Sequence, residues 1–193
     1  AANPINLYGA SKLAADKIFI AANNLSGDAH TRFCSVRYGN VSGSRGSIIP
    51  VFHDLIKNDA DYLPITDPRM TRFWISLDEG VQFVFDSLKN MHGGEIFVPK
   101  IPSMKVSDLA TAMAPDLPHK IIGIRPGEKI HEVLVSEDDS RHTVDQGTQF
   151  VIEPEFNFWN RLPQPGKLIE EGFRYQSGEN DQWLSVDDLK KLI

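Results

Sequence analysis

The sequence predicts an α/β fold built around a parallel sheet, and two observations indicate it. Residues 7–57 run from a helical pattern through a strand-like run and a glycine-rich loop to a second helical pattern. This order is typical of parallel strands joined by helices. A further helical pattern at 77–91 leads into a short apolar run at 95–98. The chain of 193 residues is 41% hydrophobic and 24% charged, which is ordinary for a globular protein large enough to bury a core.

The first helix is predicted from about residue 7 to residue 24. It follows a turn at residues 3–6, where a proline fixes one dihedral angle and asparagines tolerate unusual ones. Apolar residues recur along it at helical spacing and leave Lys12 and Asp16 on a more polar surface. The helix is therefore expected to pack one face on the sheet.

A glycine-rich loop at 39–46 follows the predicted strand at 31–38. Ligands of parallel sheets bind at the carboxyl ends of strands, and glycine lets a backbone approach a ligand closely. The loop therefore lies where a ligand is expected, although it matches neither a Walker loop nor a GxGxxG fingerprint. A flexible connector without a ligand is the alternative.

The remaining elements are delimited by glycines, prolines and helix-capping residues. Ser76 and Ser185 each precede acidic residues, as at helix starts. The predicted helices are 48–57, 77–91, 106–114, 128–135 and 185–193, the predicted extended segments are 62–65, 95–98, 119–124 and 149–152, and 136–147 and 154–177 are predicted to be polar or irregular.

The composition excludes several classes of function. The net charge of −6 gives no general attraction to nucleic acid or to an anionic membrane. No window approaches 18 apolar residues, and the start does not resemble a signal peptide, so we expect a cytoplasmic protein. The single cysteine, Cys34, is predicted to be a buried thiol. No set of metal ligands is predicted.

Tyr8 and Lys12 form a Tyr-x-x-x-Lys pair on the first predicted helix. A spacing of four places both side chains on one face, one turn apart. An ammonium near a phenol favours the phenolate, and such a tyrosine can exchange a proton with an alcohol while hydride leaves the carbon. The spacing alone is equally compatible with an ordinary surface pair.

Further motifs follow this pair in a fixed order and make the chain resemble a known family. It is similar to the C-terminal portion of extended short-chain dehydrogenase/reductases, in particular to the polysaccharide-biosynthesis branch that includes the inverting UDP-N-acetylglucosamine 4,6-dehydratases. The resembling runs are Ala2-Asn3-Pro4-Ile5-Asn6-Leu7-Tyr8-Gly9-Ala10-Ser11-Lys12, Arg37-Tyr38-Gly39-Asn40-Val41, Gly43-Ser44-Arg45-Gly46-Ser47, Ile65-Thr66-Asp67-Pro68-Arg69-Met70-Thr71-Arg72-Phe73-Trp74, Gly94-Glu95-Ile96-Phe97-Val98-Pro99-Lys100 and Gly123-Ile124-Arg125-Pro126-Gly127-Glu128-Lys129.

The resemblance implies a role for each matching position. Tyr8 and Lys12 would be catalytic and would also contact the cofactor, NADP. The other implied cofactor contacts are Val41, Ser42, Gly43, Ser44 and Arg45, and the implied contacts of a UDP-sugar are Asn40, Arg72, Arg125 and Glu128.

Elementary chemistry agrees with the implied UDP-sugar contacts. An arginine presents a fork of donors that suits a pyrophosphate. Arg125 is also expected just before a helix start, where an anion is favoured. Surface salt bridges are the alternative for both arginines, and Glu128 is alternatively an ordinary first-turn residue.

The resemblance also implies a reaction, an architecture and an assembly. The reaction is the dehydration of UDP-GlcNAc, a hydro-lyase reaction in which hydride leaves C4 and returns to C6 while C5 is inverted. The implied architecture is the C-terminal part of a Rossmann-like doubly wound sheet, formed by residues 1–60 and 77–100, with a smaller mixed α/β lobe for the UDP-sugar, formed by 61–76 and 101–193. A homo-oligomer is expected.

The sequence departs from the family at its beginning. The family carries Thr-Asp-Lys immediately before Ala-Ala-Asn-Pro, and it carries a glycine-rich cofactor fingerprint further upstream, whereas this sequence begins at Ala1. We therefore expect that the N-terminal cofactor-binding half is missing, that the chain alone is inactive, and that apolar surface is left open or is covered by a second copy. The rival functions are a nucleotide-sugar 4-epimerase and a non-catalytic fragment that binds a UDP-sugar.

Overall fold

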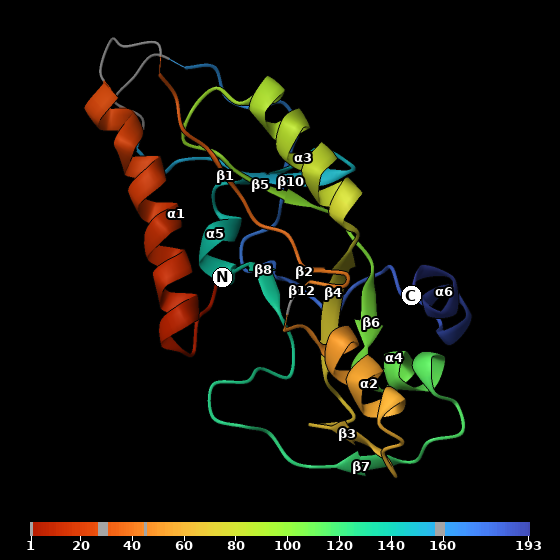
Figure 1. Ribbon diagram of the computed structural model, residues 1–193. Coiled ribbons are helices and arrows are strands. Elements are labelled where there is room, and N and C mark those ends of the chain that lie inside the picture. The colour runs from red at the N-terminus through yellow and green to blue at the C-terminus, as the bar shows by residue number, and fades with distance from the viewer. Residues whose placement is uncertain (1, 27–30, 45, 157–160) are drawn as a thin grey trace. The chain divides into compact units, whose positions relative to one another are not determined.

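The computed structural model describes residues 2–26, 31–44, 46–156 and 161–193 and confirms the α/β fold (Figure 1). Contacts divide the chain into two compact units, each built from three separate segments. Unit 1 consists of Ala1–Tyr38, Asp78–Lys100 and Val133–Tyr175, and unit 2 of Gly39–Leu77, Ile101–Glu132 and Gln176–Ile193. The expected division into a cofactor-binding half and a UDP-sugar lobe remains a prediction.

Unit 1 is organised around a mixed five-stranded sheet in the order β1-β5-β10-β9-β11 (Figure 1). β1 pairs in parallel with β5, and every other neighbouring pair is antiparallel. The strands are β1 (Ser35–Val36), β5 (Ile96–Pro99), β9 (Thr143–Asp145), β10 (Gln149–Ile152) and β11 (Lys167–Leu168), and the helices are α1 (Leu7–Ser26), α3 (Leu77–Asn90) and α5 (Glu137–Ser140). All four residues of β5 are buried, so this strand forms the centre of the unit's core.

Arg37 and Glu95 are charged residues buried in unit 1. The Arg37 guanidinium donates to Asp16 of α1 at 2.8 Å, to Asp139 of α5 at 2.9 Å and to the Leu134 carbonyl oxygen at 3.1 Å. Burial is tolerable for a charge that is paired and hydrogen-bonded in this way. The ionic contacts thus fix α1 and α5 to the end of β1.

Unit 1 also exposes apolar faces on its two long helices. On α3, Val81, Val84, Phe85 and Leu88 are between 41% and 61% exposed, and their spacing places them on one face. On α1, Ile18 is 66% exposed. These faces confirm the expectation of open apolar surface. Among the described residues, no helix is both long enough and apolar enough to cross a membrane.

Unit 2 contains a three-stranded sheet in the order β2-β4-β6 and a separate pair, β3-β7. β2 runs parallel to β4, β6 runs antiparallel to it, and β3 is parallel to β7. The strands are β2 (Asn40–Val41), β3 (Leu63–Ile65), β4 (Thr71–Ile75), β6 (Ser103–Lys105) and β7 (His119–Ile121), and the helices are α2 (Ile48–Lys57), α4 (Val106–Met113) and α6 (Val186–Leu192). The strand β4 lies between its two neighbours and is mostly buried, so it supports the rest of the unit.

Two buried apolar clusters hold the helices of unit 2 on its strands. Phe52 of α2 packs in one cluster with Leu63, Ile65 and Met70, and Trp74 of β4 packs in the other. The burial of each large side chain stabilises the fold by roughly 1.5–3 kcal/mol. Because α2 contributes to both clusters, its position relative to β4 is well determined.

Two predicted elements differ from the structure. The predicted helix at 128–135 is absent, and its last three residues instead form β8 (Val133–Val135), which pairs with β12 (Tyr175–Gln176). Valine favours strands, which suits the Val-Leu-Val sequence of β8. The strand β12, with which β8 pairs, lies far along the chain. The predicted strand at 31–38 contracts to β1, which lies at the edge of the sheet that the described residues form and pairs there with β5.

The polar stretch 136–147 is ordered rather than irregular, which corrects a further prediction. Ser136 and Asp139 form a reciprocal capping box that starts α5. In such a box the serine hydroxyl and the acidic side chain each satisfy a backbone N–H. The strand β9 follows directly and joins the sheet of unit 1.

Cys34 is half-buried, and its thiol lies 3.6 Å from the sulfur of Met91. Burial raises the pKa of the Cys34 thiol to about 11, and the Glu95 carboxylate adds to the rise. A raised pKa leaves less thiolate at neutral pH, and the thiolate is the reactive form. Cys34 is therefore expected to be a slow nucleophile.

Alkylation of the folded chain by iodoacetamide tests this expectation. At pH 8 the rate constant should be about a hundredfold below that of an unstructured cysteine peptide of ordinary pKa, and it should keep rising above pH 9. The chain unfolded in urea is the control and should react like the peptide. A rate that levels off near pH 9 in the folded chain would contradict the assignment.

Candidate functional site

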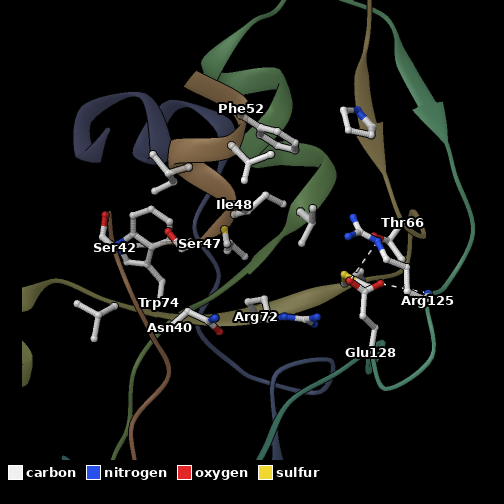
Figure 2. Close-up of a pocket in the computed structure, with 18 residues that line it drawn as sticks. Asn40, Ser42, Ser47, Ile48, Phe52, Thr66, Arg72, Trp74, Arg125 and Glu128 are labelled. Atoms are coloured by element: carbon white, nitrogen blue, oxygen red, sulfur yellow. Dashed lines mark hydrogen bonds and ion pairs between the residues drawn. The ribbon is translucent and has the colours of Figure 1, made fainter. Parts of the chain in front are cut away.

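Unit 2 contains a cavity of about 380 Å³ between α2, the strand β4 and residues 125–128. Figure 2 shows Asn40, Ser42 and Trp74 on one side of it, Thr66, Arg125 and Glu128 on the other, and Arg72 between them. A volume of this size is within the range of roughly 300–1,000 Å³ that is usual for small-molecule sites. The cavity joins an apolar wall with a few convergent polar groups.

The apolar wall comes from α2 and the strands beneath it. Ile48 and Phe52 lie one helical turn apart and both face the cavity, while Trp74, Met104 and Val106 complete the wall. Phe52, Met104 and Val106 are at most 2% exposed, so this wall is part of the packed core of unit 2. The flat face of a ring, such as that of a pyrimidine base, is the kind of group that an apolar wall accepts.

Arg72 of β4 contributes a partly buried positive charge to the cavity. Its guanidinium donates to the carbonyl oxygens of Thr71 at 2.7 Å, Lys129 at 3.0 Å and Ile130 at 3.2 Å. Burial lowers the pKa of Arg72 from its ordinary value, and the carboxylates of Glu132 and Glu128 oppose that change. The guanidinium is therefore locked in one orientation, and only part of its donor set remains for a ligand.

Arg125 and Glu128 form a second, more exposed charged pair at the cavity. The Arg125 Nε lies 3.6 Å from the Glu128 carboxylate, and the Arg125 side chain is 65% exposed. The backbone N–H of Arg125 also donates to the Glu128 carboxylate at 3.2 Å. No helix begins at Glu128, so the predicted helix N-terminus next to Arg125 was wrong. The positive charge at this side of the cavity therefore comes from the Arg125 guanidinium and not from a helix N-terminus.

The glycine-rich loop contributes to the cavity at its two ends. Asn40, Val41 and Ser42 line it at the start of the loop. Gly43 and Ser44 are exposed and do not line it, and Arg45 lies outside the described residues. The loop thus presents the first three predicted contacts to the cavity and turns the next two toward solvent.

Ser47 lines the cavity with a buried hydroxyl that has no hydrogen-bond partner among the described residues. It occupies the N-cap position of α2 but makes no capping bond. A capping serine usually accepts from the N–H of the second or third helical residue, and Pro50, the third residue here, has none. The proline thus helps to leave this hydroxyl without its usual donor.

Tyr8 and Lys12 are described within unit 1. Both lie on α1, as predicted, and the Lys12 ammonium is 5.4 Å from the centre of the Tyr8 ring. Both side chains are exposed, Tyr8 to 73%. The two side chains therefore lie next to each other on the exposed surface of α1, and their role as a catalytic pair stays a prediction.

The cavity brings together six of the predicted contacts. They are Asn40, Val41, Ser42, Arg72, Arg125 and Glu128. Sequence reasoning missed Ser47 and Thr66, whose polar groups also line the cavity. The Ser-Ile-Ile-Pro sequence was a usable signal for Ser47, because it leaves a cap without its usual donor. The described residues contain no group of three His, Cys, Asp or Glu placed to share a metal ion.

Comparison with known proteins identifies the family. The sequence profile described as "Polysaccharide biosynthesis protein" matches residues 1–154. The chain belongs to the polysaccharide biosynthesis protein family. An inverting UDP-N-acetylglucosamine 4,6-dehydratase of Campylobacter jejuni is 54% identical to this family member over 201 residues, which are the whole chain and 60% of that relative. A UDP-glucose 4-epimerase of Rickettsia bellii is 34% identical, with 98% of the chain and 57% of that relative covered.

A solved structure of the same architecture supports the fold of this family member. The X-ray structure of Pen from Bacillus thuringiensis superimposes with a TM-score of 0.84 at 32% identity, and the match covers 99% of this chain and 58% of that one. The chain thus spans about 60% of the length of the two Campylobacter jejuni dehydratases that it matches.

Proposed function

We propose that the chain is the sugar-nucleotide-binding part of an inverting UDP-N-acetylglucosamine 4,6-dehydratase, a hydro-lyase. The observation that carries the proposal is the cavity of unit 2, which unites Arg72, Arg125 and Glu128 with the unpartnered Ser47 hydroxyl. The 54% identity to a dehydratase, against 34% to an epimerase, supports dehydration over epimerisation.

The cavity residues suit the parts of a UDP-sugar. Arg125 and Arg72 would hold the diphosphate, Arg125 with most of its donors free of carbonyl partners and Arg72 with its remaining N–H groups. The Glu128 carboxylate can accept from ribose hydroxyls. The apolar wall around Phe52 would contact the uracil.

The residues of this chain that would hold a nicotinamide cofactor are Tyr8, Lys12, Val41 to Ser44 and Arg45. The exposed phenol and ammonium of α1 and the open backbone at Gly43, where an added Cβ would meet nothing within 4 Å, fit such a group. When bound, NADP would accept hydride from the sugar and return it. Tyr8 would act as a phenolate, which the Lys12 ammonium would stabilise, and it would take the proton of the C4 hydroxyl to become the neutral phenol. We expect the complete protein to be a homo-oligomer in the cytoplasm.

Incubation of the full-length protein with UDP-GlcNAc, followed by mass spectrometry, tests the proposal. A product that has lost water supports dehydration. A product of unchanged mass supports the epimerase, and calorimetric binding of UDP without turnover in any context supports a non-catalytic binding role.

Arg125→Ala tests the cavity directly, and Arg69→Ala is its matched control. Arg69 is 68% exposed and paired with Asp67, but it does not line the cavity. UDP affinity of the 193-residue chain should fall about tenfold or more in Arg125→Ala, because a charge-assisted contact to phosphate is lost. It should stay unchanged in Arg69→Ala. Equal affinities in both variants would argue against a diphosphate site at Arg125.

A further inference from the structure

Segment 129–132 carries the groups that orient Arg72. Two of the three carbonyl oxygens that accept from its guanidinium belong to Lys129 and Ile130, and Glu132 places its carboxylate 3.7 Å from Nε. This segment has no helix or strand of its own. Its position therefore depends on bonds to neighbouring parts of unit 2.

Ser177 supplies several of those bonds from a fully buried position. Its exposure is 0%, and its hydroxyl accepts from the Glu132 N–H at 2.9 Å. Its own N–H donates to the Glu132 carbonyl oxygen at 2.8 Å. The same hydroxyl lies 2.7 Å from Thr71 Oγ1 and 3.2 Å from the Thr71 carbonyl oxygen. One hydroxyl thus joins the start of β4 to segment 129–132.

Thr71 and His131 extend the same network. Thr71 Oγ1 lies 2.8 Å from His131 Nδ1, and the Thr71 N–H donates to the Ile130 carbonyl oxygen at 2.9 Å. His131 packs directly on Gly178, where an added Cβ would come within 2.6 Å of Nδ1. Segment 129–132 is therefore held between Thr71 and residues 177–178.

The network adjoins the groups that face the ligand. The Thr71 carbonyl oxygen near the Ser177 hydroxyl is also the closest acceptor of Arg72, at 2.7 Å. Neither Ser177 nor His131 lines the cavity. Any effect of Ser177 on a ligand must pass through Thr71, the segment and Arg72.

We infer that Ser177 is a positioning residue: its hydroxyl holds segment 129–132 against Thr71 and so fixes the Arg72 guanidinium in the cavity for an anionic nucleotide. The inference rests on the proposed function for the identity of the ligand, whereas the positioning itself concerns this chain alone. Buried networks of this kind act as a unit, and their coupling is measurable in double-mutant cycles.

The first test measures UDP affinity by calorimetry in Ser177→Ala, in Arg72→Ala and in the double variant. Ser177→Ala should weaken UDP about fivefold, and the same change should have almost no effect when Arg72 is already alanine. An equal loss in both backgrounds would overturn the inference, because the hydroxyl would then act on the fold in general.

Ser140→Ala is the matched control for this cycle. Ser140 is also 0% exposed, donates to the Glu137 carbonyl oxygen at 2.6 Å and accepts from the Gly172 N–H at 2.9 Å, but it lies in unit 1. Its removal should cost comparable stability and leave UDP affinity unchanged. A matching loss of affinity in Ser140→Ala would also overturn the inference.

Amide hydrogen exchange separates a failure of the inference from a failure of the proposed function. In Ser177→Ala without ligand, the backbone amides of segment 129–132, including that of Glu132, should exchange at least about tenfold faster than in the parent chain, because their acceptors are lost or displaced. Unchanged exchange overturns the positioning role even if UDP binds. Absence of UDP binding to the parent chain overturns the proposed ligand, and the exchange result still decides the positioning. Thr71→Val, which removes the adjoining hydroxyl, replaces Ser177→Ala if that variant does not fold.

Discussion

Gly39→Ala is expected to unpair β2 from β4 and to abolish UDP binding. An added Cβ at Gly39 would lie 2.4 Å from the Phe73 Cβ and 2.8 Å from the Phe73 carbonyl oxygen. The carbonyl cannot move without disturbing β4, the central strand of its sheet. Overpacking of this kind costs about 3 kcal/mol. Asn40 and Val41, the next two residues, would leave the cavity wall together with the displaced strand.

Urea unfolding and UDP titration of the same variant measure both consequences. Gly80→Ala is the control, because Gly80 lies in α3, has no unusual backbone angle, and would offer an added Cβ no neighbour within 4 Å. That change should be neutral or stabilising by up to about 1 kcal/mol. If Gly39→Ala unfolds at the same urea concentration as the parent and binds UDP normally, the close approach of β2 to β4 is refuted.

Glu95→Ala is expected to be the most destabilising single substitution in unit 1. Glu95 is 0% exposed, and its carboxylate accepts from Arg161 at 2.9 Å, from Gln164 at 3.0 Å and from the backbone N–H groups of His92 at 2.7 Å and Gly93 at 2.8 Å. Truncation to alanine removes one carboxylate partner of the buried Arg161 guanidinium. It also removes the carboxylate that accepts from the backbone N–H groups of His92 and Gly93. The expected cost is about 3–5 kcal/mol.

Glu171→Ala isolates the effect of burial in this comparison. Glu171 pairs with Arg141 at the same 2.9 Å, but both side chains are exposed, to 75% and 58%. Exposed pairs contribute only about 0–1 kcal/mol, so this variant should unfold almost like the parent. If urea unfolding shows similar losses of unfolding free energy in the two variants, the buried contacts of Glu95 do not stabilise the fold more than an exposed pair does.

The pH dependence of the Glu95→Ala effect follows from its hydrogen bonds. Burial alone would raise the pKa of Glu95, but the bonds from Gln164 and the His92 N–H, together with the Arg161 charge, outweigh it and lower the pKa from its ordinary value. A carboxylate whose pKa is lower in the folded state stabilises the fold above its unfolded pKa, and it loses that contribution as the pH falls through the folded pKa. The difference in unfolding free energy between parent and variant should therefore be largest near neutral pH and shrink below about pH 4.

The elements that the sequence predicted well are those with a local cause. The helix at 48–57 was predicted with the bounds that α2 has, because its apolar spacing and the polar residues around it act within a few positions. The helix at 128–135 failed because Val133–Val135 has its partner in β12, some forty residues away, and no local pattern contains that information.

The features of the site also divide into those that the sequence indicates and those that only the fold reveals. Ordered motifs indicated Arg72, Arg125 and Glu128, which the fold does bring to one cavity. The sequence could not indicate that the Arg72 guanidinium donates hydrogen bonds to carbonyl oxygens of segment 129–132. Those bonds depend on the position of the segment, which Ser177 holds. Roles in catalysis for Tyr8 and Lys12 remain predictions.

The helix α6 backs one wall of the cavity from outside it. Leu189 of α6 is fully buried in the same cluster as Trp74, a wall of the cavity, and Ser103 exchanges backbone bonds with Gln182 and Leu184. Trp74 is therefore supported from behind only when α6 is docked. Detachment of α6 would leave this part of the cavity wall without its backing, although every residue that lines the cavity would be present.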